Sequence, residues 1–153
     1  MTKNKKPYFP MFVDLTEKQV VVVGAGTIAK RRIRTLTEFT NHLTVIAPEV
    51  NRELLDMEKS GLLHIKKKNY ECEDIYGADL VIAATNDHQT NSDIYNVCKC
   101  LGITVNVCSD KTRCDFYFPM ISRIENVVVG VSASGSNQRK AKEVLNKLLS
   151  LFT

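Results

Sequence analysis

A glycine motif with a recognisable spacing lies near the start of the chain. Gly24, Gly26 and Ala29 form G-x-G-x-x-A directly after the apolar run Gln19–Val23. In such a motif the first glycine permits a tight turn, the second lets the backbone approach a pyrophosphate, and the small third residue lets a helix pack closely on a strand. The start of that helix would offer free N–H groups to phosphate oxygens. We therefore predict that Gly24 and Gly26 bind a dinucleotide; the alternative is a tight strand-to-helix turn without a ligand.

The residues after the second expected strand would bind the adenosine ribose. Leu43–Ala47 is followed by Pro48 and Glu49. Because an acid at this position usually holds the ribose hydroxyls, either Glu49 reaches the ribose or the backbone of Pro48 and Glu49 binds it. No arginine follows the strand directly, and Arg52 is the nearest, so the sequence favours NAD over NADP.

Thr85 is a further candidate for contact with the cofactor. It follows the expected strand Asp79–Ala84, and the carboxyl ends of parallel strands line the ligand crevice of a doubly wound sheet. We predict that Thr85 lies beside the cofactor. The alternative is that Thr85, Asn86 or Asp87 only caps the next helix.

Alternating strand and helix patterns would position these residues. Apolar runs predict five strands, and helical spacing predicts the helices between them: strands at Gln19–Val23, Leu43–Ala47, Leu62–Ile65, Asp79–Ala84 and Thr104–Val107, and helices at Thr27–Phe39, Val50–Ser60 and His88–Leu101. This order predicts an α/β protein with a Rossmann-like, doubly wound parallel sheet over residues 1–112.

The end of the chain has a different pattern. Phe116–Pro119 and Asn126–Ala133 resemble strands joined by a short turn, and Gln138–Phe152 has the spacing of an amphipathic helix. We predict that residues 113–153 form a small β-β-α dimerisation module.

Composition limits the function classes. The 153 residues include 21 Lys and Arg against 17 Asp and Glu, a net charge of +4. Because the basic residues are spread along the chain without a nucleic-acid-binding motif, we expect an anionic small molecule as partner and no nucleic acid. The longest nearly apolar run, Val20–Ala29, is too short to span a bilayer, so no membrane is expected. Five cysteines without a C-x-x-C pair are typical of a reducing, cytoplasmic protein.

Several longer motifs together resemble one family, the N-terminal module of siroheme synthase, which comprises precorrin-2 dehydrogenases with or without sirohydrochlorin ferrochelatase activity. The motifs are YFPMFVDL (8–15), VVVGAGTIAKRR (21–32), LTVIAPE (43–49), ADLVIAATND (78–87) with Asn91 after it, VNVCSDKTRCDFYFP (105–119) and ISRIENVVVGVSASG (121–135). The first three suit many dinucleotide enzymes, whereas the later ones are more specific.

The resemblance implies an activity and its partners. Family members oxidise precorrin-2 to sirohydrochlorin with NAD⁺, and some then insert Fe²⁺. The implied partners are an anionic tetrapyrrole and a second copy of the chain in a homodimer. By position, Thr27, Ile28, Pro48 and Glu49 match the family's NAD-contacting turns.

The resemblance also implies a catalytic acid. In the family it lies in the loop after the fifth strand, three or four residues past an asparagine. Counting from Asn106, the third position is Ser109 and the next is Asp110. We predict Asp110 as the general acid/base, with capping of the turn as the alternative and Asp115 as the second candidate.

The family's S/T-G-G-x-S-P motif is altered in this chain. Ser134 replaces the first of the paired glycines and Gln138 replaces the proline. Ser134, Ser136 and Arg139 are the expected substrate-binding residues, although a solvated first helical turn would also explain Arg139. Family members continue for some tens of residues past the position of Thr153, so a version completed by a partner stays open.

No metal site is expected. His88 is the one histidine near the expected crevice, and Cys108 and Cys114 are interpreted as small buried apolar residues. Two other functions remain open: an NAD-binding regulatory module without catalysis, and a relative that binds a tetrapyrrole or a metal without turnover.

Overall fold

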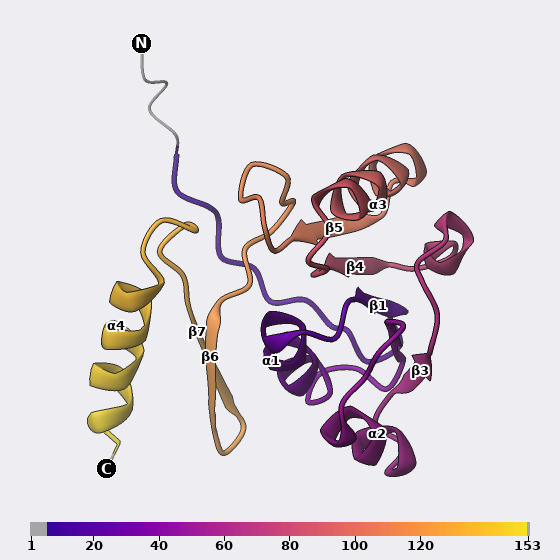
Figure 1. Ribbon diagram of the computed structural model, residues 1–153. Helices are drawn as coiled ribbons and strands as arrows, with labels where there is room; N and C mark the ends of the chain where they lie inside the picture. The colour runs from indigo at the N-terminus through magenta and orange to yellow at the C-terminus, as the bar shows by residue number, and fades with distance from the viewer. Residues whose placement is uncertain (1–5, 153) are drawn as a thin grey trace. The chain divides into compact units, whose positions relative to one another are not determined.

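The structure, a computed structural model, describes residues 6–152. The chain divides into two compact units (Figure 1). The larger unit is Asp14–Phe116, and the smaller one combines the residues up to Val13 with those from Tyr117 onward.

The larger unit contains a five-stranded parallel sheet in the order β3-β2-β1-β4-β5. Its elements, in chain order, are β1 (Val20–Val23), α1 (Thr27–Leu36), β2 (Leu43–Ile46), α2 (Arg52–Lys59), β3 (His64–Lys66), the 3₁₀ turn η1 (Cys72–Ile75), β4 (Leu80–Ala83), α3 (His88–Leu101) and β5 (Thr104–Val107). Figure 1 shows α1 and α2 on one face of the sheet and α3 on the other. The predicted Rossmann-like, doubly wound α/β fold is confirmed.

Both faces of the sheet are buried, which explains the unbroken valine run of β1. Val21 and Val23 pack in the same apolar cluster as Ile94 and Cys98 of α3. Val20 and Val22 point the other way and are also buried. A strand covered on both faces has no solvent side to carry polar residues, so hydrophobicity does not alternate along it.

The strand order reverses between β1 and β4. From β1 the chain moves outward to β2 and β3, then returns to pair β4 with the opposite edge of β1. In open parallel sheets, ligands bind outside the carboxyl ends of the strands at such a reversal. The ends of β1, β2, β4 and β5 are therefore the candidate site.

The smaller unit is an antiparallel hairpin with one helix. β6 (Met120–Ile124) pairs with β7 (Val127–Val131), and α4 (Gln138–Ser150) packs on both strands. The turn between the strands includes Glu125, whose φ of 54° is in the left-handed region. The strand, strand and helix order agrees with the sequence, although the domain boundary predicted at residue 112 stays a prediction.

One strand is placed wrongly by the sequence. Phe116–Pro119 is not a strand; the first hairpin strand is Met120–Ile124 instead. The Phe116 carbonyl accepts a hydrogen bond from the Asn106 side chain at 2.9 Å rather than from a neighbouring strand, and Pro119 has no N–H to donate.

The helix limits predicted from the sequence also differ in places. The first helix ends at Leu36, where Phe39 was expected, and α2 begins at Arg52 because Asn51 caps it, its side chain accepting from the Leu54 N–H at 3.2 Å. The last helix ends at Ser150 and not at Phe152. Among residues 6–152, no helix is long and apolar enough to cross a membrane.

Candidate functional site

Gly24 is required by the protein's own packing. Its φ is +114°, and a Cβ built on it would lie 2.3 Å from the Ala84 carbonyl oxygen, where the chain leaves β4. The Gly24 N–H continues the sheet by donating to the Ile46 carbonyl at 2.8 Å. Any side chain here would separate β1 from β4, so this glycine is explained without a ligand.

Gly26 differs, because none of the contacts of residues 6–152 requires it to be glycine. Its φ is −72°, which any residue adopts, and a Cβ built on it would meet no atom of that part of the chain within 4 Å beyond its own neighbours in the sequence. It precedes α1 as the N-cap residue without a side-chain cap, and the first turn contains no acid. The backbone therefore stays open where a phosphate would approach the N–H groups of Thr27 and Ile28. These residues fit a dinucleotide pyrophosphate.

The end of β2 presents the predicted ribose-binding residues. Pro48 and Glu49 are exposed directly after the strand. Arg52, the basic residue nearest to them in the sequence, is 95% exposed and lies 3.9 Å from Asp56 of its own helix. Pro48 and Glu49 thus lie at the same edge of the sheet as Gly26.

Thr85, at the end of β4, belongs to a hydrogen-bond network centred on Asn91. Asn91 is 2% exposed. Its Oδ1 accepts from the Thr85 N–H at 3.2 Å and from the Thr85 hydroxyl at 2.7 Å, while its Nδ2 donates to the Thr85 carbonyl at 3.1 Å and to Ser109 Oγ at 3.2 Å. The helix cap is Asp87, whose carboxylate accepts from the N–H groups of Gln89 and Thr90. Asn91 therefore joins the loops that follow β4 and β5.

Asn91 lies in one of the family-like motifs, but the sequence alone indicates no role for it. The available signal was its position on α3, at a spacing of three and seven residues from the buried Ile94 and Cys98. A polar residue on the inward stripe of a helix needs hydrogen-bond partners inside the fold.

The predicted acid, Asp110, is held in a turn. One carboxylate oxygen accepts from the N–H and the hydroxyl of Thr112, at 2.9 and 2.6 Å, and the other lies 3.6 Å from the Arg113 guanidinium. These Thr112 hydrogen bonds, with a smaller contribution from Arg113, lower the pKa of Asp110 below its ordinary value. Asp110 is thus an ionised carboxylate that also caps the turn.

Asp115, the second candidate, is tied to the edge of the sheet. One oxygen accepts from Lys99 of α3 at 2.6 Å, and the other accepts from the Val105 N–H at 3.0 Å. Both oxygens thus hold the segment after β5 against α3 and β5.

A basic residue that the sequence analysis left without a role lies near the β5 loop. The Arg32 guanidinium of α1 hydrogen-bonds the Cys108 thiol, and burial is the main cause that lowers the pKa of Arg32. Burial also raises the pKa of the Cys108 thiol, against the opposing effect of Arg32. Burial likewise raises the pKa of Cys114, so both thiols stay protonated at neutral pH.

The predicted substrate-binding residues lie in the smaller unit. Ser134 has a φ of 50°, in the left-handed region, next to Gly135 at 69°. The Ser136 hydroxyl donates to the Ala133 carbonyl at 2.6 Å. Arg139 is 91% exposed and lies 3.2 Å from Glu143. The conformation of Ser134 is the one that glycine adopts most easily, which agrees with its position in a glycine motif.

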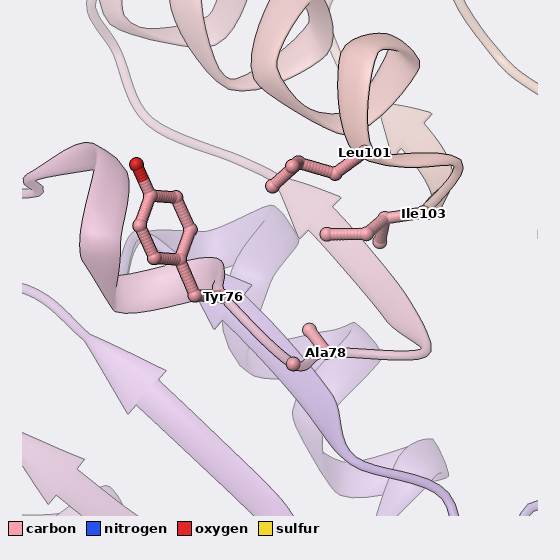
Figure 2. A pocket seen from close by; sticks show the side chains of 5 residues that line it. Tyr76, Ala78, Leu101 and Ile103 are labelled. Carbon is pink, nitrogen blue, oxygen red and sulfur yellow. The ribbon is translucent and has the colours of Figure 1, made fainter.

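A shallow apolar pocket of about 280 Å³ lies in the larger unit (Figure 2). Tyr76, Gly77 and Ala78 line it from the segment before β4, and Leu101 and Ile103 line it from the segment before β5. It is therefore at the amino end of the strands, opposite the candidate site. Within residues 6–152, no group of three or more His, Cys, Asp or Glu side chains could hold a metal ion.

Comparison with known proteins agrees with this geometry. The model of a family described as "Putative NAD(P)-binding" matches residues 11–120. The "Probable multifunctional siroheme biosynthesis protein HemA" of Ruminiclostridium josui is 40% identical over 141 residues, which are 92% of this chain and 27% of the relative. A siroheme synthase of Mannheimia succiniciproducens is 35% identical over 145 residues, which are 95% of this chain and 30% of the relative.

A solved structure is similar over most of the chain. "SirC, precorrin-2 dehydrogenase" superposes with a TM-score of 0.78 at 26% identity, covering 95% of this chain and 71% of that one. The chain spans about three tenths of the length of the two curated relatives above. These findings confirm the resemblance to siroheme synthases that the motifs indicate.

Proposed function

Since the chain belongs to this NAD(P)-binding family, we propose that it is an NAD-dependent dehydrogenase that oxidises precorrin-2 to sirohydrochlorin in siroheme biosynthesis. The observation that carries the proposal is the similarity to a precorrin-2 dehydrogenase over 95% of the chain. The open backbone at Gly26 also supports the proposal, because it fits a pyrophosphate and because no packing contact within residues 6–152 requires a glycine at this position.

The proposed reaction balances without a further reactant. Precorrin-2 gives a hydride to NAD⁺ and releases a proton, which yields sirohydrochlorin and NADH. NAD supplies the hydride acceptor, so the chain has to bind the two molecules, orient them and accept a proton. Asp110 is our candidate for the proton acceptor because it is ionised and follows β5, although its bonds to Thr112 make it a weaker base than an unpaired carboxylate.

The residues proposed to bind NAD come from successive strand ends. Gly26 and the first turn of α1 would bind the pyrophosphate, and Pro48 and Glu49 would bind the adenosine ribose. We propose NAD rather than NADP because the first charged side chain after β2 is the acidic Glu49. An acid there accepts hydrogen bonds from ribose hydroxyls and repels a 2′-phosphate.

The proposed tetrapyrrole substrate carries many carboxylates. The net charge of +4 suits such a ligand. Ser134, Ser136 and Arg139 are the side chains we propose for carboxylate contacts, with Arg139 as the charged partner.

A turnover assay tests the proposal directly. Enzymatically prepared precorrin-2 and NAD⁺ are supplied without metal, and NADH and sirohydrochlorin are measured together. Equal amounts of both products support the dehydrogenase. NAD⁺ binding without turnover refutes it and leaves an NAD-binding module without catalysis.

Fe²⁺ enters only as a substrate of a second activity. We propose that Fe²⁺ added under anaerobic conditions is inserted into sirohydrochlorin faster than in a control without protein. An equal rate would limit the chain to the dehydrogenase step. The five free cysteines fit a reducing compartment, and we propose the cytoplasm.

We propose that the smaller unit forms a homodimer. Of its described residues, only Ala141 and Leu145 are buried apolar side chains, and a two-stranded hairpin with so small a core is marginal alone. Val144 and Leu148 of α4 are exposed, as is Leu151 directly after the helix, at a spacing of four and three residues. Such an apolar stripe on a helix is suited to a second copy.

The test is the oligomeric state at several protein concentrations. Leu148→Lys, in the exposed stripe, should shift the protein to the monomer in analytical ultracentrifugation. Asn146→Lys adds the same charge on the opposite side of α4 and should leave the dimer unchanged. A monomeric wild-type protein at micromolar concentration would refute the dimer.

A further inference from the structure

Asn91 joins the two strand ends that lie on the far side of β1 from β2. We propose that Ser109 donates a hydrogen bond to the nicotinamide half of the dinucleotide, and that Asn91 is the positioning residue that orients Ser109. The inference rests on the proposed function, because it assumes that NAD is the ligand of this edge of the sheet.

Asn91 acts through its neighbours and not on a ligand. A side-chain amide has two N–H donors and one oxygen with two lone pairs. In Asn91 the oxygen accepts two hydrogen bonds from Thr85, and the nitrogen donates one to the Thr85 carbonyl and one to Ser109. All four positions are thus occupied inside the protein. A buried amide with no spare capacity fixes the two loops it connects.

The hydroxyls of Thr85 and Ser109 differ in whether their proton is free to bind a ligand. The Thr85 hydroxyl proton lies between Asn91 Oδ1 at 2.7 Å and the Asp87 carbonyl at 3.0 Å, and its oxygen accepts from the Asp87 N–H at 3.2 Å. The Ser109 oxygen accepts from Asn91, but its own proton has no acceptor assigned within residues 6–152. Ser109 is exposed. Ser109 is therefore the hydroxyl that can donate to a ligand.

The strand order places the Ser109 hydroxyl on the side of the sheet edge where we expect the nicotinamide half of the dinucleotide. With the adenosine over the end of β2 and the pyrophosphate at α1, the other half of a dinucleotide extends over the ends of β4 and β5. The nicotinamide carries a carboxamide oxygen, which accepts hydrogen bonds. Asp110, the next residue, is an ionised carboxylate whose oxygens accept from Thr112 and face Arg113, so it has no proton to donate. Ser109 is therefore the donor on this part of the loop.

Binding of two ligands to the full chain separates the nicotinamide from the rest. NAD⁺ and ADP-ribose share the adenosine and the pyrophosphate, but only NAD⁺ carries nicotinamide. In isothermal titration calorimetry, Ser109→Ala should weaken NAD⁺ by about three- to tenfold, the range expected for one neutral hydrogen bond, and leave ADP-ribose unchanged. Ser109→Thr retains a hydroxyl and should restore most of the NAD⁺ affinity.

The positioning role has its own variant and control. Asn91→Asp removes both N–H donors while keeping the size, and should reduce the preference for NAD⁺ over ADP-ribose as Ser109→Ala does. Ser92→Ala is the matched control, because Ser92 also accepts a hydrogen bond from the loop, from Arg113 at 2.7 Å. Its preference should equal that of the wild type. Should Asn91→Asp fail to fold, Ser109→Ala still decides the proposal.

The outcomes separate this inference from the proposed function. A wild-type protein that binds neither ligand refutes the cofactor and both proposals with it. A wild-type protein that binds both, with the same preference in Ser109→Ala, refutes the contact with Ser109 alone. An equal loss of preference in Ser92→Ala would show a general loosening of the loop and would also refute the contact.

Discussion

Replacing Gly26 with alanine tests whether the protein or a ligand requires this glycine. Gly24→Ala is the natural partner variant, since both changes add one methyl group to the same loop. A Cβ at position 24 would overlap the Ala84 carbonyl, whereas a Cβ at position 26 would meet none of the described residues within 4 Å, apart from its sequence neighbours. We therefore expect Gly24→Ala to lose stability and Gly26→Ala to lose dinucleotide binding.

The cost of Gly24→Ala has two parts. A left-handed conformation costs an L-residue about 1–2 kcal/mol, and φ at Gly24 is +114°. The contact of 2.3 Å with a backbone oxygen forces β1 and β4 apart, and overpacking of this kind costs about 1–3 kcal/mol. The sum is about 2–5 kcal/mol. For a unit of this size the expected fall in Tm is roughly 10 °C or more.

Gly26→Ala should change stability little. Alanine reduces the entropy of the unfolded chain, which stabilises by about 0.4–1 kcal/mol where φ allows it, and the φ of −72° does. Alanine is a poorer N-cap residue than glycine, which offsets this gain. The net change is within about 1 kcal/mol. The added methyl group instead occupies the space in which a phosphate would approach α1, so NAD⁺ affinity should fall at least about tenfold.

Thermal unfolding and calorimetric titration with NAD⁺ are measured for both variants. An unchanged Tm with a lowered NAD⁺ affinity in Gly26→Ala would support a pyrophosphate site at the start of α1. Wild-type affinity in a folded Gly26→Ala protein would refute the pyrophosphate site at α1. A Gly24→Ala protein as stable as the wild type would instead refute the packing role assigned to Gly24.

Three further predictions concern the smaller unit, the turn at Asp110 and the cysteines of α3. Ser134→Gly should raise the free energy of unfolding by about 1 kcal/mol, since glycine adopts the positive φ of Ser134 without strain. Ala133→Gly is the control and should lower the free energy of unfolding, and thermal denaturation compares both variants with the wild type. Asp110→Ala should lower the free energy of unfolding at neutral pH. Because the folded state lowers the pKa of Asp110 below 3.8, the wild-type protein should be more stable than the variant by the full amount above pH 3.8, and this difference should disappear as the pH falls through the folded-state pKa. Denaturation of both proteins between pH 7 and about pH 3 measures the difference. Burial raises the pKa of Cys98 to about 11 whereas Cys100 is exposed, so alkylation at pH 8 followed by mass spectrometry should label Cys100 and spare Cys98 in the folded protein.

The sheet could be predicted from the sequence because its signal is local. A run such as Val20–Val23 can be buried on both faces only in a covered parallel sheet, and the glycine motif after it indicates the strand-to-helix turn. The limits of α3 were predicted correctly because Asp87 caps its start and Gly102, with a φ of 70°, ends it. Where the sequence contains residues that start and end a helix, tertiary contacts shift the limits of that helix little.

The segment after β5 could not be predicted in the same way. Phe116 and its neighbours have the composition of a strand, but the partner of the Phe116 carbonyl is a side chain, Asn106, ten residues earlier. The role of Asn91 likewise depends on Ser109, eighteen residues later. Apolar periodicity contains no information on such side-chain pairings, because they form only once the strands are side by side.

The family-like motif in the segment after β5 consists mainly of residues that attach this segment to α3. Side chains of α3 hold it at three places: Asn91 to Ser109, Ser92 to Arg113, and Lys99 to Asp115. In this chain Asp110 caps the turn, while Ser109 presents the hydroxyl. The proposed ligand contact is therefore inferred from where a residue lies on the loop and whether its side chain has a free hydrogen-bond donor. Residue type alone is a poorer guide.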